Sequence, residues 1–185
     1  YMGLDSVSFL SFGDKPWEIT KSPMSALPMG KRNLPATSET GVTASSGRRH
    51  ALCFQVENGR RELTAHMGRF HGDAALDAHI VLTDEPEESM VICTPFDRPG
   101  HFYFNQKINC MRADGTVTIG THRWRFSPED SFAVLDWGRG VWTYRNTWYW
   151  GSASGLVDGV PFGFNIGYGF GSNLAATENM LFYNG

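Results

Sequence analysis

The sequence predicts an all-β protein whose antiparallel strands form a barrel or a strongly curved sheet, with little helix. Aromatic residues make up 14% of the 185-residue chain and there are 21 Gly, a mixture that suits aromatic walls and many turns. Apolar and polar residues alternate over several segments, which is typical of strands with one buried face. Asn-Gly or Asp-Gly pairs, which are typical of tight hairpin turns, stand at 58–59, 114–115 and 184–185.

The first half of the chain predicts strands that are separated by one long loop. Residues 1–12 indicate a strand around Val7 and Phe9, and residues 13–49 are rich in Pro, Ser, Gly and Thr, which predicts a loop with short extended pieces. ALCFQVE and ELTAHM flank Asn58–Gly59 and predict a hairpin. Residues 76–83 alternate, and SMVICT (89–94) is a further strand.

The second half predicts another hairpin, one short helix and three more extended segments. HFYFNQKINC (101–110) and TVTIGTHRWRF (116–126) flank Asp114–Gly115. Ser127, Pro128 and Asp130 resemble a capping box and predict a helix over 128–136. Its last turn would place the Asp136 carboxyl at the negative end of the helix dipole, which favours the neutral acid. WTYRNTWYWGSAS, VPFGFNIGYGF (160–170) and NMLFY (179–183) predict strands.

Composition narrows the function classes. The net charge is −3 and Lys and Arg are scattered, which argues against a nucleic-acid surface. No run of 18 apolar residues and no signal peptide are visible, so we expect a cytoplasmic protein without a transmembrane segment. Three widely spaced Cys predict no disulfide framework, and the six His have no zinc spacing, so we expect neither a metal nor a cofactor.

We expect one β domain or a fragment of one. Its parts are a strand and loop over 1–50, hairpins over 51–126, and an aromatic, Gly-rich site segment over 127–185. The chain opens on Tyr1 rather than Met, and no strand follows the turn signal at Asn184–Gly185. Because proteins avoid open strand edges, these ends predict a longer native chain.

The stretch 127–155 is the strongest candidate for a site, because it holds four of the six Trp with ionisable residues among them. Asp136 is a candidate acid or base, or the partner of Arg139 in a structural ion pair. Arg139 and Arg145 either bind an anionic group or stack on Trp, and Tyr144 lies between them as a further ligand-binding candidate. Trp148 and Trp150, on one strand face, either wall a pocket or fill a core.

Three candidates lie outside that stretch. Glu178 precedes an apolar strand and is a second candidate acid, and with Asn179 it could place an acid and a hydrogen-bond donor at a pocket rim. The alternative is a turn, in which Asn179 is a capping residue, and this is the better interpretation of Asn179. Lys107 lies in a half-apolar strand, where it either points into a polar cavity or, more commonly, extends its ammonium to the solvent at an edge. Asn165 is a candidate polar group inside the same cavity. Distant motifs of similar chemistry are expected to converge in a barrel interior.

Five short motifs are spaced along the second half of the chain: NQK (105–107), DWGRG (136–140), W-x-W-x-S-A-S-G (148–155), G-F-N (163–165) and T-E-N (177–179). Together they resemble a bacterial family known as domain of unknown function 2804. That family is distantly similar to the lipocalin-like carotenoid hydratases. This similarity implies a lipocalin-like β structure, two barrel-like halves in the full domain, and hydrophobic ligands, although a fold does not determine a function.

Three functions remain open from the sequence. The first is an enzyme that acts on an apolar or amphipathic small molecule, lipid or isoprenoid-like, by hydration, isomerisation or cyclisation, with Asp136 transferring the proton. The second is a carrier with the same cavity and no chemistry. The third is a carbohydrate-active protein that uses Asp136 and Glu178 as paired acids. The surroundings of Asp136 and the separation of the two carboxyl groups distinguish these functions.

Overall fold

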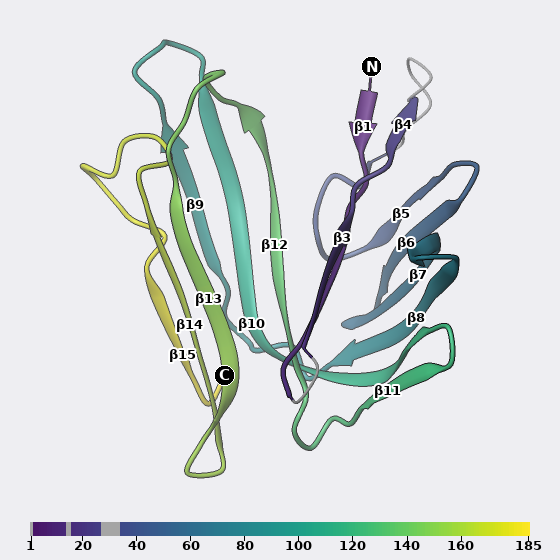
Figure 1. Cartoon of the computed structure of the whole chain (residues 1–185). Coiled ribbons are helices and arrows are strands. Elements are labelled where there is room, and N and C mark those ends of the chain that lie inside the picture. The colour runs from purple at the N-terminus through teal and green to yellow at the C-terminus, as the bar shows by residue number, and fades with distance from the viewer. Residues whose placement is uncertain (1, 14–15, 27–33) are drawn as a thin grey trace. The chain divides into compact units, whose positions relative to one another are not determined.

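The computed structural model describes residues 2–13, 16–26 and 34–185 and contains fifteen strands and no helix within those ranges (Figure 1). The strands pair in antiparallel sheets. The prediction of an all-β fold with strongly curved sheets is therefore confirmed, and among the described strands no sheet closes into a barrel. None of the described segments is a helix long and apolar enough to cross a membrane.

The chain divides into two compact units, which we call unit 1 and unit 2. Unit 1 comprises residues 1–81 and 114–127, and unit 2 comprises 82–113 and 128–185. The long strand β10 (Phe102–Ile119) belongs to both, because residues up to 113 lie in unit 2 and the rest in unit 1.

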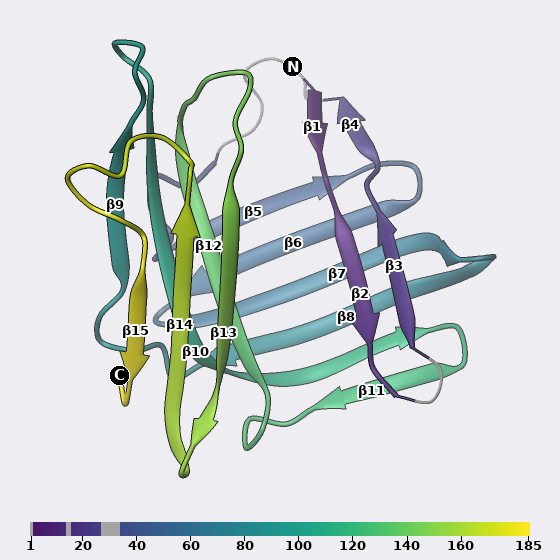
Figure 2. The ribbon, with the colours of Figure 1, turned by 60° about the vertical axis from the view of Figure 1, so that its left-hand side comes forward.

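Unit 1 is a curved sheet with short strand pairs packed on it. Its sheet contains β5 (Gly41–Ser46), β6 (His50–Glu57), β7 (Arg60–His71), β8 (Ala74–Thr83), the end of β10 and β11 (His122–Phe126). Two pairs accompany it: β1 (Met2–Leu4) with β4 (Met24–Ala26), and β2 (Val7–Ser11) with β3 (Trp17–Lys21). Figure 2 shows β2 and β3 running across the strands of this sheet.

The core of unit 1 lies between the sheet and the β2–β3 pair. Met67, Phe70, Leu76, Val117 and Ile119 are buried and in mutual contact. Val7, Phe9, Trp17 and Ile19 from β2 and β3 pack against them. Alternation in β2 and β3 places these apolar side chains on one face, and burying that face drives the pair onto the sheet.

Unit 2 consists of two three-stranded layers. One contains β9 (Met90–Pro95), the first part of β10, and β12 (Phe132–Val141), with β10 in the middle. The other contains β13 (Tyr149–Val157), β14 (Val160–Tyr168) and β15 (Met180–Tyr183). A bulge in β10 between Ile108 and Met111 links the layers. There the Asn109 amide donates to Ser152 Oγ, and the Cys110 N–H donates to Ser154 Oγ at 2.9 Å.

The hairpin expected at Asn58–Gly59 is confirmed, with φ of 52° and 73° at the two turn residues. An equivalent turn at Asp158–Gly159 joins β13 to β14 and was not predicted. The hairpin expected at Asp114–Gly115 is wrong, because β10 continues through both residues and the chain turns after Ile119. Gly115 instead allows β10 to approach β8 closely, since a Cβ on Gly115 would collide with the backbone of His79.

Two further sequence expectations are corrected. The helix expected over 128–136 is absent, because Phe132–Val141 pairs with β10 and this long-range pairing overrides the local capping signal. The helix-dipole argument for a neutral Asp136 therefore does not apply. The loop expected over 13–49 contains β3, β4 and β5, while residues 14–15 and 27–33 lie outside the described part of the chain.

Candidate functional site

The candidate site is built around Lys107, whose side chain has 0% exposure in the interior of unit 2. Strand alternation in β10 places Lys107 on the same face as Tyr103 and Asn105. The β10–β12 register sets Lys107 opposite Asp136, so the two side chains meet across the strands. The expectation that Lys107 reaches solvent at an edge is thus wrong.

Two carboxylates flank the Lys107 ammonium. Its Nζ lies 2.5 Å from Asp136 Oδ1 and 3.6 Å from Glu178 Oε2. Glu178 is almost completely enclosed, whereas the Asp136 side chain keeps 31% of its surface exposed. The cluster thus sets two carboxyl groups against one ammonium.

Two indole rings close the other side of the cluster. Lys107 Nζ lies 5.6 Å from the ring centroid of Trp148 and 5.5 Å from that of Trp150, within the range of cation–π attraction. The two rings are 38% and 43% exposed and lie 5.7 Å apart. Each indole therefore has one side against the lysine and a substantial surface that remains open.

The indole N–H groups are held by the polar residues of the cluster. Trp148 Nε1 donates to Glu178 Oε1 at 3.1 Å, and Trp150 Nε1 donates to Asn165 Oδ1 at 2.8 Å. The Asn165 amide in turn donates to the Glu178 carbonyl at 2.7 Å. Asn179, expected as a turn residue, accepts a hydrogen bond from the Gly167 N–H at 2.8 Å. This bond ties the segment that contains Glu178 to β14. The site walls are thus fixed by hydrogen bonds as well as by packing.

Tyr103 extends the cluster, and the sequence reasoning did not single it out. Burial raises the pKa of the Tyr103 phenol well above its usual range, and the charges of Asp136 and Glu178 and a hydrogen bond to Asp136 raise it further. Its ring packs edge-on against Trp142 and Phe170, with centroids 5.6 and 5.0 Å away. Tyr103 is therefore a neutral hydroxyl that donates to the Asp136 carboxylate.

The glycines of the DWGRG motif make room for this arrangement. Alternation in β12 puts Asp136, Gly138 and Gly140 on the face toward Lys107. A Cβ on Gly138 would lie 2.8 Å from the Tyr103 ring and 2.9 Å from its hydroxyl oxygen. On β14, a Cβ on Gly167 would collide with the Glu178 carboxyl group. Two glycines thus leave the space in which the ionisable groups meet.

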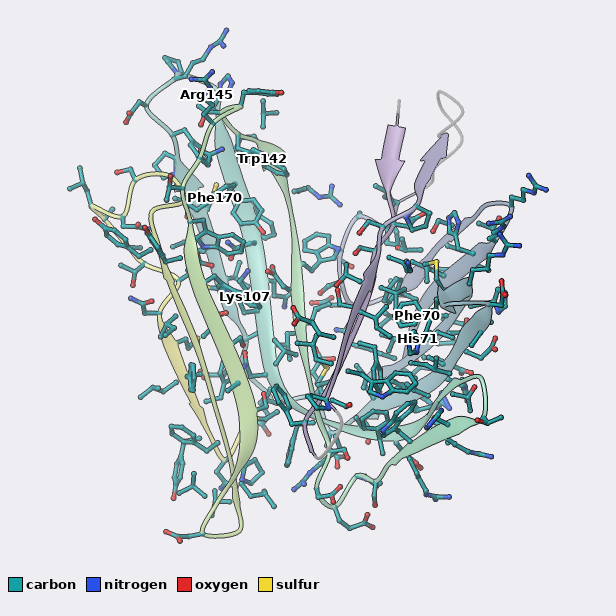
Figure 3. The ribbon with its side chains drawn as sticks, in the orientation of Figure 1. Phe70, His71, Lys107, Trp142, Arg145 and Phe170 are labelled. Atoms are coloured by element: carbon teal, nitrogen blue, oxygen red, sulfur yellow. The ribbon has the colours of Figure 1, made fainter. Side chains whose placement is uncertain are left out.

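The remaining predicted site residues lie elsewhere. Arg139 is on the opposite face of β12 from Asp136 and stacks on Trp137, with its guanidinium carbon 5.1 Å from the ring centroid. Tyr144 is fully exposed in the segment between β12 and β13, and Arg145 is in the same segment. Figure 3 shows Arg145 at the loop end of this unit, beyond Trp142 and Phe170, whereas Lys107 lies in the middle of β10.

The structure therefore brings together Lys107, Asp136, Trp148, Trp150, Asn165 and Glu178. Among the described residues, no group of three or more His, Cys, Asp and Glu is placed to hold a metal ion.

Comparison with known families agrees with the resemblance noted in the sequence. The family described as "Domain of unknown function (DUF2804)" matches residues 1–185. The chain belongs to this family. No curated protein and no solved structure matched the chain. All five motifs of the resemblance supply residues at the Lys107 cluster: NQK gives Lys107, DWGRG gives Asp136, and the other three give the Trp pair, Asn165 and Glu178.

Proposed function

We propose that this DUF2804 protein binds an apolar or amphipathic small molecule, lipid or isoprenoid-like, on the aromatic wall of unit 2. We further propose that the carboxylates beneath the wall carry out acid–base chemistry on that molecule. One observation carries the proposal: the buried Lys107 and Glu178 and the partly open Asp136 form a charged cluster against the half-exposed Trp148 and Trp150.

The aromatic wall is continuous. Five rings follow one another with neighbouring centroids 5.0–6.0 Å apart: Trp142, Tyr103, Phe170, Trp148 and Trp150. Such a rigid apolar surface beside a few convergent polar groups is the usual composition of a small-molecule site. The wall supports binding of an extended apolar molecule whose polar or reactive end reaches the charged cluster.

The charged cluster is suited to proton transfer. Asp136 is the carboxyl group that is partly open, and its Oδ1 lies 2.5 Å from the Lys107 ammonium. We therefore assign Asp136 the role of the group that transfers the proton, with the Tyr103 hydroxyl as its hydrogen-bond donor. Isomerisation, cyclisation and hydration of an unsaturated ligand all require such a transfer.

The position of Lys107 argues against the carbohydrate-active alternative. A glycosidase needs the space between its two carboxyl groups for the glycosidic bond. Here the Lys107 ammonium occupies that position, in contact with Asp136 and 3.6 Å from Glu178. The apolar-ligand function is the better match to this geometry.

A first experiment tests binding. The protein is titrated with farnesene, a C15 hydrocarbon, while tryptophan emission is recorded. We expect saturable quenching in wild type and binding at least about tenfold weaker in Trp150→Leu, since truncating a central aromatic contact costs roughly 2 kcal/mol or more. Trp137→Leu, on the other face of β12, is the matched control and should bind as wild type does. Absence of saturable binding, or equal losses in both variants, would contradict the proposal.

A second experiment separates an enzyme from a carrier. Apolar compounds that co-purify with the protein are extracted, identified and assayed for turnover. Asp136→Asn should keep the affinity and lose about 10²–10⁴-fold in rate, the usual contribution of a general acid or base. Equal turnover in wild type and variant, or binding with no turnover, would replace the enzyme with a carrier.

A further inference from the structure

We infer that the polar end of the ligand is a hydroxyl group, which makes the ligand an apolar alcohol. This inference rests on the proposed function and specifies its ligand class. It starts from two enclosed polar atoms of the cluster, Lys107 Nζ and Glu178 Oε2. Lys107 Nζ lies 2.5 Å from Asp136 Oδ1 but has three protons to donate, and Glu178 Oε2, at 3.6 Å from Nζ, makes no hydrogen bond in the described part of the chain. Enclosed polar groups rarely leave their hydrogen-bonding capacity unused, so the remaining donors of Nζ beside Oε2 indicate a group that is bound there.

The spacing of these two atoms selects the group. They lie 3.6 Å apart, which is too long for a direct hydrogen bond. A hydroxyl oxygen beside both atoms accepts a proton from Nζ and donates its own to Oε2, so it satisfies both at once. A carbonyl or an ether oxygen accepts only and leaves Oε2 without a donor. A carboxylate adds a third negative charge to two that are already there.

The other polar atoms of the cluster either already make hydrogen bonds or are acceptors without a donor. Glu178 Oε1 accepts from Trp148, and Asn165 bonds both Trp150 and the Glu178 backbone. Asn105 Oδ1, on the same strand face as Lys107, is also enclosed and makes no hydrogen bond. Because a hydroxyl has one proton, it can donate to Glu178 Oε2 or to Asn105 Oδ1 but not to both at once.

The indole rings lie beside the gap. Trp148 and Trp150 lie against Lys107, so a hydroxyl that binds beside Nζ lies next to both rings. Trp148 donates to the Glu178 carboxylate and Trp150 to the Asn165 amide, so displacing either ring breaks one hydrogen bond. Binding of an alcohol should therefore change tryptophan emission, and this change provides the readout.

The experiment compares four C15 compounds with one carbon skeleton and different ends: farnesol, farnesal, farnesyl methyl ether and farnesene. Each is titrated into wild type, Glu178→Gln and the surface control Glu88→Gln. We expect farnesol to bind about tenfold or more tighter than the other three in wild type and in Glu88→Gln, as a hydrogen bond to a charged group provides. Glu178→Gln should lose this preference and bind all four alike.

Each result supports or contradicts either the alcohol inference or the proposed function. Equal binding of the four compounds by wild type overturns the alcohol inference and leaves the apolar-ligand function standing, with a water molecule as the group that fills the gap. A preference for farnesol that persists in Glu178→Gln also overturns it. Binding of none of the four contradicts the proposed function itself, and the inference falls with it. If Glu178→Gln does not fold, the four-way comparison in wild type decides alone.

Discussion

The interiors of the two units differ in polarity. The core of unit 1 consists of apolar side chains around Phe70 and Leu76, and the polar residues it buries have partners: His50 contacts Asp5 at 3.1 Å and Arg61 donates to the Ser38 carbonyl. In unit 2 the completely buried side chains include Asn105, Lys107, Asn109 and Asn165.

The same contrast holds for hydrogen bonding. In the described part of the chain, all buried side-chain atoms without a hydrogen-bond partner lie in unit 2: Asn105 Oδ1, Lys107 Nζ, Asn109 Oδ1 and Glu178 Oε2. Buried polar groups of this kind cost stability, and proteins tolerate them mainly where function requires them. The comparison supports the proposal that the functional site lies in unit 2.

Substituting one buried residue in each interior should give the largest losses of stability and test the apolar and the charged core separately. Phe70→Ala should cost about 3–5 kcal/mol in free energy of unfolding, because it leaves a cavity. Lys107→Met should cost a similar amount, about 3–5 kcal/mol at neutral pH, because Asp136 and Glu178 lose their cation. Urea unfolding at pH 7.5 measures both. If Lys107→Met is as stable as wild type, the charged interior of unit 2 is not the stabilising arrangement described above.

A smaller effect is expected from glycines that differ in the space around them. Gly138→Ala should cost about 1–3 kcal/mol, because its Cβ would lie 2.6 Å from the Phe104 carbonyl and 2.8 Å from the Tyr103 ring. Gly155→Ala, in β13, is the matched control, since nothing lies within 4 Å of its Cβ, and it should change stability by less than about 0.5 kcal/mol. Thermal unfolding measures both variants, and equal stability would refute the close packing of Tyr103.

Much of the fold could be predicted, because alternation and tight turns are local signals. The hairpin at Asn58–Gly59 and the strands at 76–83 and 89–94 follow from them. The prediction of a helix over 128–136 was wrong because the capping signal at Ser127 is local. The pairing of β12 with β10 joins residues that are distant in the sequence, such as Lys107 and Asp136, and a local signal does not reveal it. The hairpin predicted at Asp114–Gly115 was wrong because a glycine also allows two strands to approach closely, as Gly115 does at the His79 backbone.

The site was partly predictable for the same reason. Asp136, Trp148, Trp150, Asn165 and Glu178 were chosen by residue type, and the structure brings them together. Arg139 was chosen by residue type as well, but it lies on the opposite face of β12 from Asp136 and stacks on Trp137. The burial of Lys107 and the role of Tyr103 could not be predicted, because each depends on which strand lies opposite β10.

The smallest expected effect concerns the alkaline stability of unit 2. The pKa of Tyr103 is raised in the folded protein, chiefly by burial, above the value of about 10 in an unfolded chain. As pH rises above 10, the unfolded state loses this proton while the folded state keeps it, so the unfolded state binds fewer protons and stability falls. Below pH 10 this contribution is fully present.

Tyr103→Phe removes the titrating group, so the loss of stability between pH 9 and pH 11 should be smaller in this variant than in wild type. Tyr144→Phe, which changes a fully exposed tyrosine in the segment between β12 and β13, is the control and should follow wild type over the same range. Urea unfolding at half-unit pH intervals measures the difference. If Tyr103→Phe and Tyr144→Phe lose stability equally with rising pH, the phenol of Tyr103 is not held neutral beside Asp136. The proton donor assigned to the Asp136 carboxylate would then have to be another group of the cluster.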